Sequence, residues 1–284
     1  MAHTGKRYLL KKAPAGIPEK FMNDALFTPD WSLALLCAFA FLAGFIDSIV
    51  GGGGLVQVPA FFVLYPHLLV PQIIGTNRFA SAVGTSVAAW NYARTVPIPW
   101  RTVFFAGVAA AVCSYAGATV QSRLPSGLLK PIILVLIIVV AAYTYRKKHL
   151  GQEEHFRVPE TRIPVWAAGI GAALGFYNGL VGPGTGSLLV FSFVSVIGYN
   201  FLSASALSKV VNVIADVSSL IFFIMHKYVL IHLALPIMVF NVAGSYTGSR
   251  MAVVRGNAFV RNVFLVVVAG IIARFAWDVF FKIL

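Results

Sequence analysis

Hydrophobic positions in this chain form long runs instead of the alternating or amphipathic patterns of a soluble fold. Apolar stretches with few or no charges recur from Trp31 onward, and the stretch "IILVLIIVVAAY" (132–143) has no polar face. Apolar runs of about 18 residues or more are typical of transmembrane helices, whereas a helix of a soluble bundle needs a polar outer stripe. The pattern therefore predicts a polytopic α-helical membrane protein and excludes a soluble bundle.

Glycine, proline and charged residues divide the apolar part of the chain into ten segments. The second and seventh are only about 15 residues long, short of the roughly 20 that a crossing helix needs. Short apolar segments beside glycine breaks are typical of re-entrant or broken helices. The predicted segments are 31–50, 55–69, 72–94, 100–121, 127–146, 163–181, 186–199, 201–224, 228–250 and 258–282.

Two stretches of the first half align with two of the second half at an offset of 131 positions, and a third pair, "GATVQSR" (117–123) and "GSYTGSR" (244–250), aligns after a four-residue shift. In the register of 131 positions "GFIDSIVGGGG" (44–54) lies against "GFYNGLVGPGT" (175–185), and "TNRFASAVGT" (76–85) lies against "LSKVVNVIAD" (207–216). We therefore predict two homologous repeats of about five hydrophobic segments each. The predicted organisation is a basic cytoplasmic N-terminal tail (1–30), membrane repeat 1 (31–146), a basic linker loop (147–162) and membrane repeat 2 (163–284).

A narrow polar stripe occurs in both halves at equivalent positions. Its members recur at i, i+4 and i+8 and so share one helix face, with a cation beside the first member. A charge at mid-depth in a membrane costs at least about 2.5–3.5 kcal/mol, so it normally faces a partner or a wet cavity. The register pairs Asn77 with Ser208, Arg78 with Lys209, Ser81 with Asn212, and Thr85 with Asp216.

The glycine motifs "GGGG" (51–54) and "GPGTG" (182–186) interrupt helices at membrane depth. Small residues can simply allow close helix packing, but consecutive glycines and an interior proline also end a helix. The helix that follows each break presents free N–H groups and a positive dipole end, which favour an anion. The residues predicted to supply these groups are Gly52, Gly53, Gly54, Gly184, Thr185 and Gly186.

Together these features predict a small anion site between Arg78 and Lys209. Asp47 and Asp216 are candidates to carry a coupling ion or proton, or to pair with the two cations. The structural alternative is that the cations snorkel to an interface or hold helices together. Neutral hydrogen bonds to the anion are predicted from Asn77, Ser81, Ser208 and Asn212.

The net charge of +13 does not indicate a nucleic-acid partner, because the basic residues gather in tails and loops. That placement follows the positive-inside pattern of membrane proteins. If all ten segments crossed, the runs 1–30 and 147–162 would lie on opposite sides of the membrane, whereas four crossings and one re-entrant segment per half place both on one side. The charge pattern therefore favours eight crossings, which implies parallel repeats, while an odd number of crossings per half would make the repeats inverted. The expected partners are the lipid bilayer and a small anionic substrate, with a homo-oligomer left open.

Motifs of common enzyme and cofactor sites are absent from the sequence. The chain has no G-x-x-x-x-G-K-[ST], H-E-x-x-H or G-x-S-x-G pattern, so nucleotide binding and intramembrane proteolysis have no support. Cys37 and Cys113 lie in apolar segments, where cysteine acts as a small hydrophobe. We therefore expect no enzyme activity, no cofactor and no metal.

At the two glycine breaks and the two polar stripes, the chain resembles the TauE/SafE family of membrane proteins, the sulfite and organosulfonate exporters. The resemblance implies a multi-pass transporter of the bacterial inner membrane, with small sulfur-containing anions such as sulfite or sulfoacetate as substrates. An anion-selective channel is the alternative class, since broken helices and basic residues also form selectivity filters. The matching residues are 43–60, 75–88, 174–187 and 206–220.

Overall fold

The computed structural model describes residues 31–125 and 154–282. The predicted N-terminal tail, the segment 127–146 and the first part of the linker loop 147–162 therefore lie outside the described residues. The chain divides into two compact units, residues 1–35 and 36–284. Apart from the first residues of helix α3, the description that follows concerns the second unit.

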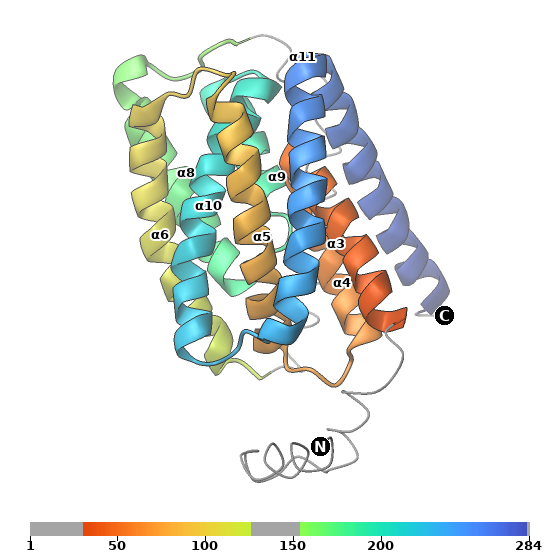
Figure 1. The fold of residues 1–284 in the computed structure, drawn as a ribbon. Helices are drawn as coiled ribbons and strands as arrows, with labels where there is room; N and C mark the ends of the chain where they lie inside the picture. Colours follow the sequence, from red (N-terminus) through yellow and green to blue (C-terminus); the bar gives the residue numbers. More distant parts are fainter. Residues whose placement is uncertain (1–30, 126–153, 283–284) are drawn as a thin grey trace, which may run out of the picture. The chain divides into compact units, whose positions relative to one another are not determined.

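Every regular element in the described residues is helical, and four of these helices are long and apolar enough to cross a membrane: Trp31–Val50, Trp100–Arg123, Glu160–Leu180 and Phe201–Met225. This confirms the all-α membrane fold. The elements, labelled in Figure 1, are α3 (Trp31–Val50), α4 (Gly54–Leu64), α5 (Val70–Ala93), α6 (Trp100–Arg123), η1 (Glu160–Arg162), α8 (Ile163–Leu180), α9 (Thr185–Ser192), the π-helix η2 (Phe193–Ile197), α10 (Phe201–Met225) and α11 (Ile231–Lys282).

Helix α11 contains the last two predicted segments, 228–250 and 258–282, in one element. The two helical stretches meet at Gly256, whose backbone has φ 71° and ψ −163°. This positive φ is readily available to glycine, because a Cβ atom would crowd the backbone there. The prediction of two segments thus holds in substance, since the helix kinks between them.

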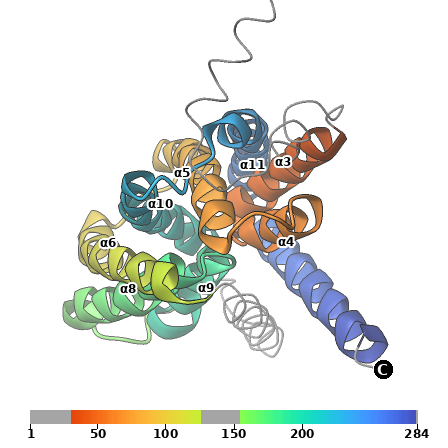
Figure 2. The ribbon, with the colours of Figure 1, turned by 90° about the horizontal axis from the view of Figure 1, so that it is seen from below.

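Helices α3, α5 and the first stretch of α11 run in the same direction. Asn91, near the end of α5, donates to Ser249 over 2.9 Å, and Thr76, near its start, accepts from the amide of Leu230 over 3.0 Å. Backbone contacts of Gly44 with Asn241 and of Phe45 with Gly248 place α3 parallel to α11. Figures 1 and 2 both show α5 beside α11.

Helices α6, α8 and α10 are likewise parallel to one another. Gly171 and Gly179 of α8 lie against Ala106 and Ser114 of α6. Ser218 of α10 donates to the carbonyl of Ala111 over 2.6 Å, and Gly107 contacts Ile214.

The α6, α8 and α10 group runs opposite to the α3, α5 and α11 group. The start of α10 lies near the α11 kink, because the amide of Leu202 donates to Asn257 Oδ1 over 3.1 Å. The other end of α10, at Phe223, lies against Gly75 near the start of α5. Helices α3 and α8, which the register pairs, therefore run in opposite directions. The parallel arrangement predicted from loop charges is wrong, because that count does not include the helix contacts that fix direction.

Each half of the sequence contributes one helix that packs on helices of the other half. Helix α6 belongs to the first half but packs on α8 and α10, whereas the first stretch of α11 belongs to the second half and packs on α3 and α5. A main apolar core, which includes Ala106, Ala167 and Val211, extends from α6, α8 and α10 to residues of α9, η2, α3, α5 and α11. The interior thus depends on contacts between the halves.

Close packing of α8 on α6 predicts opposite effects for two glycine substitutions in the same helix. A Cβ atom at Gly175 would lie 2.5 Å from the Cα atom of Ala110, whereas one at Gly169 would meet nothing within 4 Å. We expect Gly175→Ala to lower the free energy of unfolding by about 1–3 kcal/mol through overpacking. Gly169→Ala should leave it unchanged or raise it by about 0.5–1 kcal/mol. Denaturant unfolding in detergent measures both, and equal effects would contradict this packing.

Candidate functional site

The two glycine breaks meet each other inside the helical unit. Gly51 and Gly182 occupy left-handed backbone conformations, with φ of 79° and 86°. The backbones are so close that a Cβ atom on Gly186 would lie 2.7 Å from the Cα atom of Gly51. Glycine is needed here both for the positive φ and for the approach. The residues on either side of the breaks are thereby brought together from both halves of the sequence.

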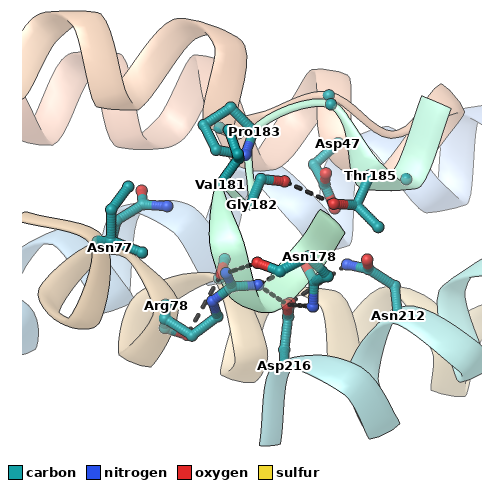
Figure 3. A pocket seen from close by; sticks show the side chains of 16 residues that line it. Asp47, Asn77, Arg78, Asn178, Val181, Gly182, Pro183, Thr185, Asn212 and Asp216 are labelled. Carbon is teal, nitrogen blue, oxygen red and sulfur yellow. Dashed lines mark hydrogen bonds and ion pairs between the residues drawn. The ribbon is translucent and has the colours of Figure 1, made fainter. Parts of the chain in front are cut away.

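Arg78 of α5 forms a buried network beside the second break. Its Nη1 atom lies 2.5 Å from Asp216 Oδ1 and 2.5 Å from Asn178 Oδ1, and its Nη2 atom donates to the Asn178 carbonyl. Asn178 Nδ2 donates to Asp216 Oδ1 over 2.9 Å, and Asn212 Nδ2 donates to Oδ2 over 3.2 Å. Figure 3 shows these side chains converging beside the glycine break from α5, α8 and α10. The carboxylate of Asp216 is therefore held by one cation and two amides.

Lys209 of α10 forms a second buried network beside the first break. Its Nζ atom donates to the Asp47 carbonyl and lies 3.5 Å from Asp47 Oδ2. The same carboxylate accepts from the amide of Gly53 over 3.2 Å and from Thr85 Oγ1 over 3.1 Å. Asp47 thus ties the end of α3, the glycine break and α5 together.

The two networks use positions that the register makes equivalent. In each, a cation from one half donates to a backbone carbonyl near the end of the helix that precedes the break of the other half. Cations are favoured there because the last carbonyls of a helix carry partial negative charge. The acid occupies different positions in the two networks. The equivalent pairs are Arg78 and Lys209, Asn178 and Asp47, and Asp216 and Thr85.

A small cavity of about 30 Å³ lies between the breaks and the Arg78 network. Such a volume holds about one or two water-sized groups. Most of the predicted site residues line it: Asp47, Gly52, Gly54, Asn77, Arg78, Ser81, Gly184, Thr185, Gly186, Asn212 and Asp216.

Three predicted site residues do not line this cavity. Lys209 is fully buried against Asp47, and Ser208 beside it is buried too. Gly53 belongs to the first break, and its amide donates to the carboxylate of Asp47. The geometry therefore places one cation, Arg78, at the cavity, instead of the pair of cations that the sequence suggested.

Several polar atoms around the cavity have no hydrogen-bond partner among the described residues. They include Oδ1 of Asn77 and Oδ1 of Asn212, both of which line the cavity, and the hydroxyl of Ser187 at the second break. The backbone amide of Thr185 donates to the carbonyl of Gly182, and that of Leu188 donates to the carbonyl of Gly184. The amides of Gly186 and Ser187, which lie between them, form no such bond among the described residues. Buried polar groups normally have partners, so these atoms are available to a polar ligand.

Sequence reasoning missed Asn178 as a site residue. Its side chain and carbonyl both bind Arg78, and it lines the cavity. The register already sets Asn178 against Asp47, and this equivalence was the signal that could have identified it. Thr85, the stripe member equivalent to Asp216, was also left out of the predicted site, although it donates to Asp47.

The fold and the site define a class of protein before any comparison. Several apolar helices, two of them interrupted by glycines that meet at a buried polar cavity, are the features of a multi-pass membrane transporter. Residues 36–275 match the family described as sulfite exporter TauE/SafE, and the chain belongs to this family. Membership of a transporter family indicates a protein that is not an enzyme.

The chain matches curated relatives over nearly their whole length, and these relatives are named as probable membrane transporters. The chain is 32% identical over 248 residues to "Probable membrane transporter protein ORF9" of Sinorhizobium sp, which covers 87% of this chain and 93% of the relative. It is 28% identical over 256 residues to "Probable membrane transporter protein YfcA" of Escherichia coli K12, covering 90% and 94%. No solved structure matches the chain.

The Lys209 network predicts a coupled effect on stability. Lys209→Met removes the cation from Asp47, whose side chain is 15% exposed. Loss of one partner of a buried pair costs about 3–5 kcal/mol, and this partial exposure reduces the expected loss to roughly 2–4 kcal/mol. Adding Asp47→Asn should restore part of that loss, which unfolding of both single variants and the double variant in detergent would measure. Additive effects would show that the pair is not coupled.

Proposed function

We propose that the protein is a secondary transporter that exports small anions, foremost sulfite or organosulfonates, across the membrane. The observation that carries this proposal is Arg78, a buried arginine at a cavity where two broken helices meet. Arg78 lies eight residues after the start of α5, about 12 Å along the helix. If α5 starts at one surface of a hydrocarbon core about 30 Å thick, Arg78 lies near mid-depth, where a charge is by default a functional group.

Anion binding is supported by the donors that the cavity offers. The planar guanidinium of Arg78 suits an oxyanion, because it can donate two parallel hydrogen bonds. Further donors are the amide groups of Asn77 and Asn212 and the backbone amide of Gly186, all of which line the cavity. Under this proposal, Ser81 and Thr185 complete the polar lining, and Lys209 with Ser208 and Gly53 supports the break from behind. The choice of sulfur oxyanions comes from the family description and not from the geometry.

An alternating-access mechanism is supported by the opposite orientation of the equivalent helices α3 and α8. We take the segments 31–146 and 163–284 as two inverted repeats, and α4 and α9 as re-entrant helices because both are too short to cross. In inverted-repeat transporters the substrate lies near the midplane, and the repeats move against each other. Asp47 and Asp216 are the candidates for coupling to an ion or proton.

A channel receives less support than a transporter. An open filter needs a continuous path, whereas here an ion pair of 2.5 Å between Arg78 and Asp216 crosses the site. Both relatives named above are described as probable membrane transporter proteins. Flux against a concentration gradient separates the two classes, since a channel cannot accumulate its substrate.

The test is flux in proteoliposomes across sulfite, thiosulfate, sulfonates, sulfate and carboxylates. We expect Arg78→Gln to reduce sulfite or sulfonate flux by about 10–100-fold, because a charged hydrogen bond contributes about 1.5–3 kcal/mol. Arg101→Gln is the matched control, since Arg101 is an exposed arginine at the start of α6.

The two variants also separate transport from a structural role for the buried cation. Thermal unfolding of each purified variant shows whether it is folded. Unchanged flux in a folded Arg78→Gln protein would contradict the proposed anion site and would favour a purely structural ion pair. Flux of no anion in the wild type would contradict the transporter proposal itself.

A further inference from the structure

We infer that Asp216 is the proton-binding group of the transport cycle, and that one proton moves with each monovalent anion. This inference rests on the proposed function. It follows from one fact of the geometry: the cation that would bind the anion is already bound by a carboxylate of the protein itself. Arg78 Nη1 lies 2.5 Å from Asp216 Oδ1, and both residues line the cavity.

An anion that enters the cavity must compete with Asp216 for Arg78. Both donors of Arg78 Nη1 are used, one by Asp216 Oδ1 and one by Asn178 Oδ1, and Nη2 donates to the Asn178 carbonyl. A carboxylate and a sulfonate or sulfite oxygen are acceptors of the same kind, so both cannot take the same donor. An anion that binds at Nη1 therefore requires Asp216 to give up its bond to Arg78.

Once separated from Arg78, a charged Asp216 would have no cation of its own. It is 2% exposed, and its remaining partners, Asn178 and Asn212, are neutral amides. Lys209 lies on the same helix but is held by Asp47 at the other break. Because a buried charge without a counter-charge is strongly unfavourable, protonation of Asp216 is the change that allows the anion to stay.

The protonated carboxyl group would find a hydrogen-bond acceptor in place. Asn212 donates through Nδ2 to Asp216 Oδ2 over 3.2 Å, and its own Oδ1 atom has no partner among the described residues. If Oδ2 of Asp216 carries a proton, rotation of the Asn212 amide turns this bond around, so that the O–H group donates to Oδ1. The neutral form of Asp216 is therefore satisfied as well as the charged form.

The charge balance of the site gives the same stoichiometry. The charged groups that face Asp216 are Arg78 from α5, Asp47 from α3 and Lys209 from α10 itself. Every other charged side chain whose burial the structure describes is exposed. These four charges sum to zero. A monovalent anion alone would make the site negative, whereas an anion with one proton keeps it neutral.

Asp216 is assigned this role in preference to Asp47. The carboxylate of Asp47 accepts from the backbone amide of Gly53 and from Thr85 as well as facing Lys209. Lys209 does not line the cavity, so an entering anion does not displace Asp47 from its cation. Asp47 therefore keeps its charge throughout, while Asp216 alternates between charged and neutral forms.

The experiment uses a sulfonate as the probe, because a sulfonate stays ionised across the pH range used, whereas sulfite itself binds protons. Full-length protein in liposomes is given a pH gradient with the membrane potential clamped, while labelled sulfonate and internal pH are followed. We expect the wild type to accumulate sulfonate and to move about one proton with each anion. Anion flux without proton movement would overturn this inference and leave the proposed function standing, whereas flux of no anion would overturn the proposed function.

The matched variants are Asp216→Asn and Glu160→Gln, the latter an exposed acid before α8. Asparagine imitates the neutral carboxyl group, so Asp216→Asn should still exchange internal for external sulfonate. It should lose at least tenfold of the accumulation driven by the pH gradient, while Glu160→Gln behaves as the wild type. Retained accumulation in Asp216→Asn, or loss of exchange in a folded sample, would overturn the inference. If Asp216→Asn does not fold, the proton-to-sulfonate ratio of the wild type decides.

Discussion

The structure depends on one interaction that occurs twice: a buried cation from one half of the chain binds a backbone carbonyl near the helix end of the other half. Arg78 binds Asn178 in this way, and Lys209 binds Asp47. Broken helices leave carbonyl and amide groups without partners, which is costly inside a membrane. The two cations reduce this cost for the carbonyls, and they also join the halves at the point where the glycine breaks touch.

The two networks differ in the position of the acid. In the Lys209 network the acid is Asp47, which lies at the end of α3 and also accepts from the amide of Gly53. In the Arg78 network the acid is Asp216 on α10, and the position at the end of α8 is the neutral Asn178. Asp47 is thereby fixed to the backbone of its break, whereas Asp216 is held by side chains that can rearrange. The pseudo-symmetry supplies two cations, and the asymmetry gives them different roles.

Much of the site could be predicted because hydrophobic runs and glycine breaks are local features of a sequence. A charge within an apolar run is costly wherever the chain folds, so Arg78, Lys209 and Asp216 stand out without any structure. Asn178 did not, because a neutral amide in an apolar run carries no such cost and its role depends on the arginine that it meets. The directions of the helices were also missed, since the loop charges that were counted carry no information about packing.

By itself, the sequence determined the all-helical membrane fold, the family and the positions of the two breaks. These depend on hydropathy, on glycine and proline, and on a motif spacing that is visible in one chain. Only the tertiary structure decided which cation faces the cavity and which acid binds which cation, because these pairs join residues more than 100 positions apart. It also decided that α3 and α8 run in opposite directions, since helix direction is fixed by contacts such as those of Gly44 and Gly171 and not by composition.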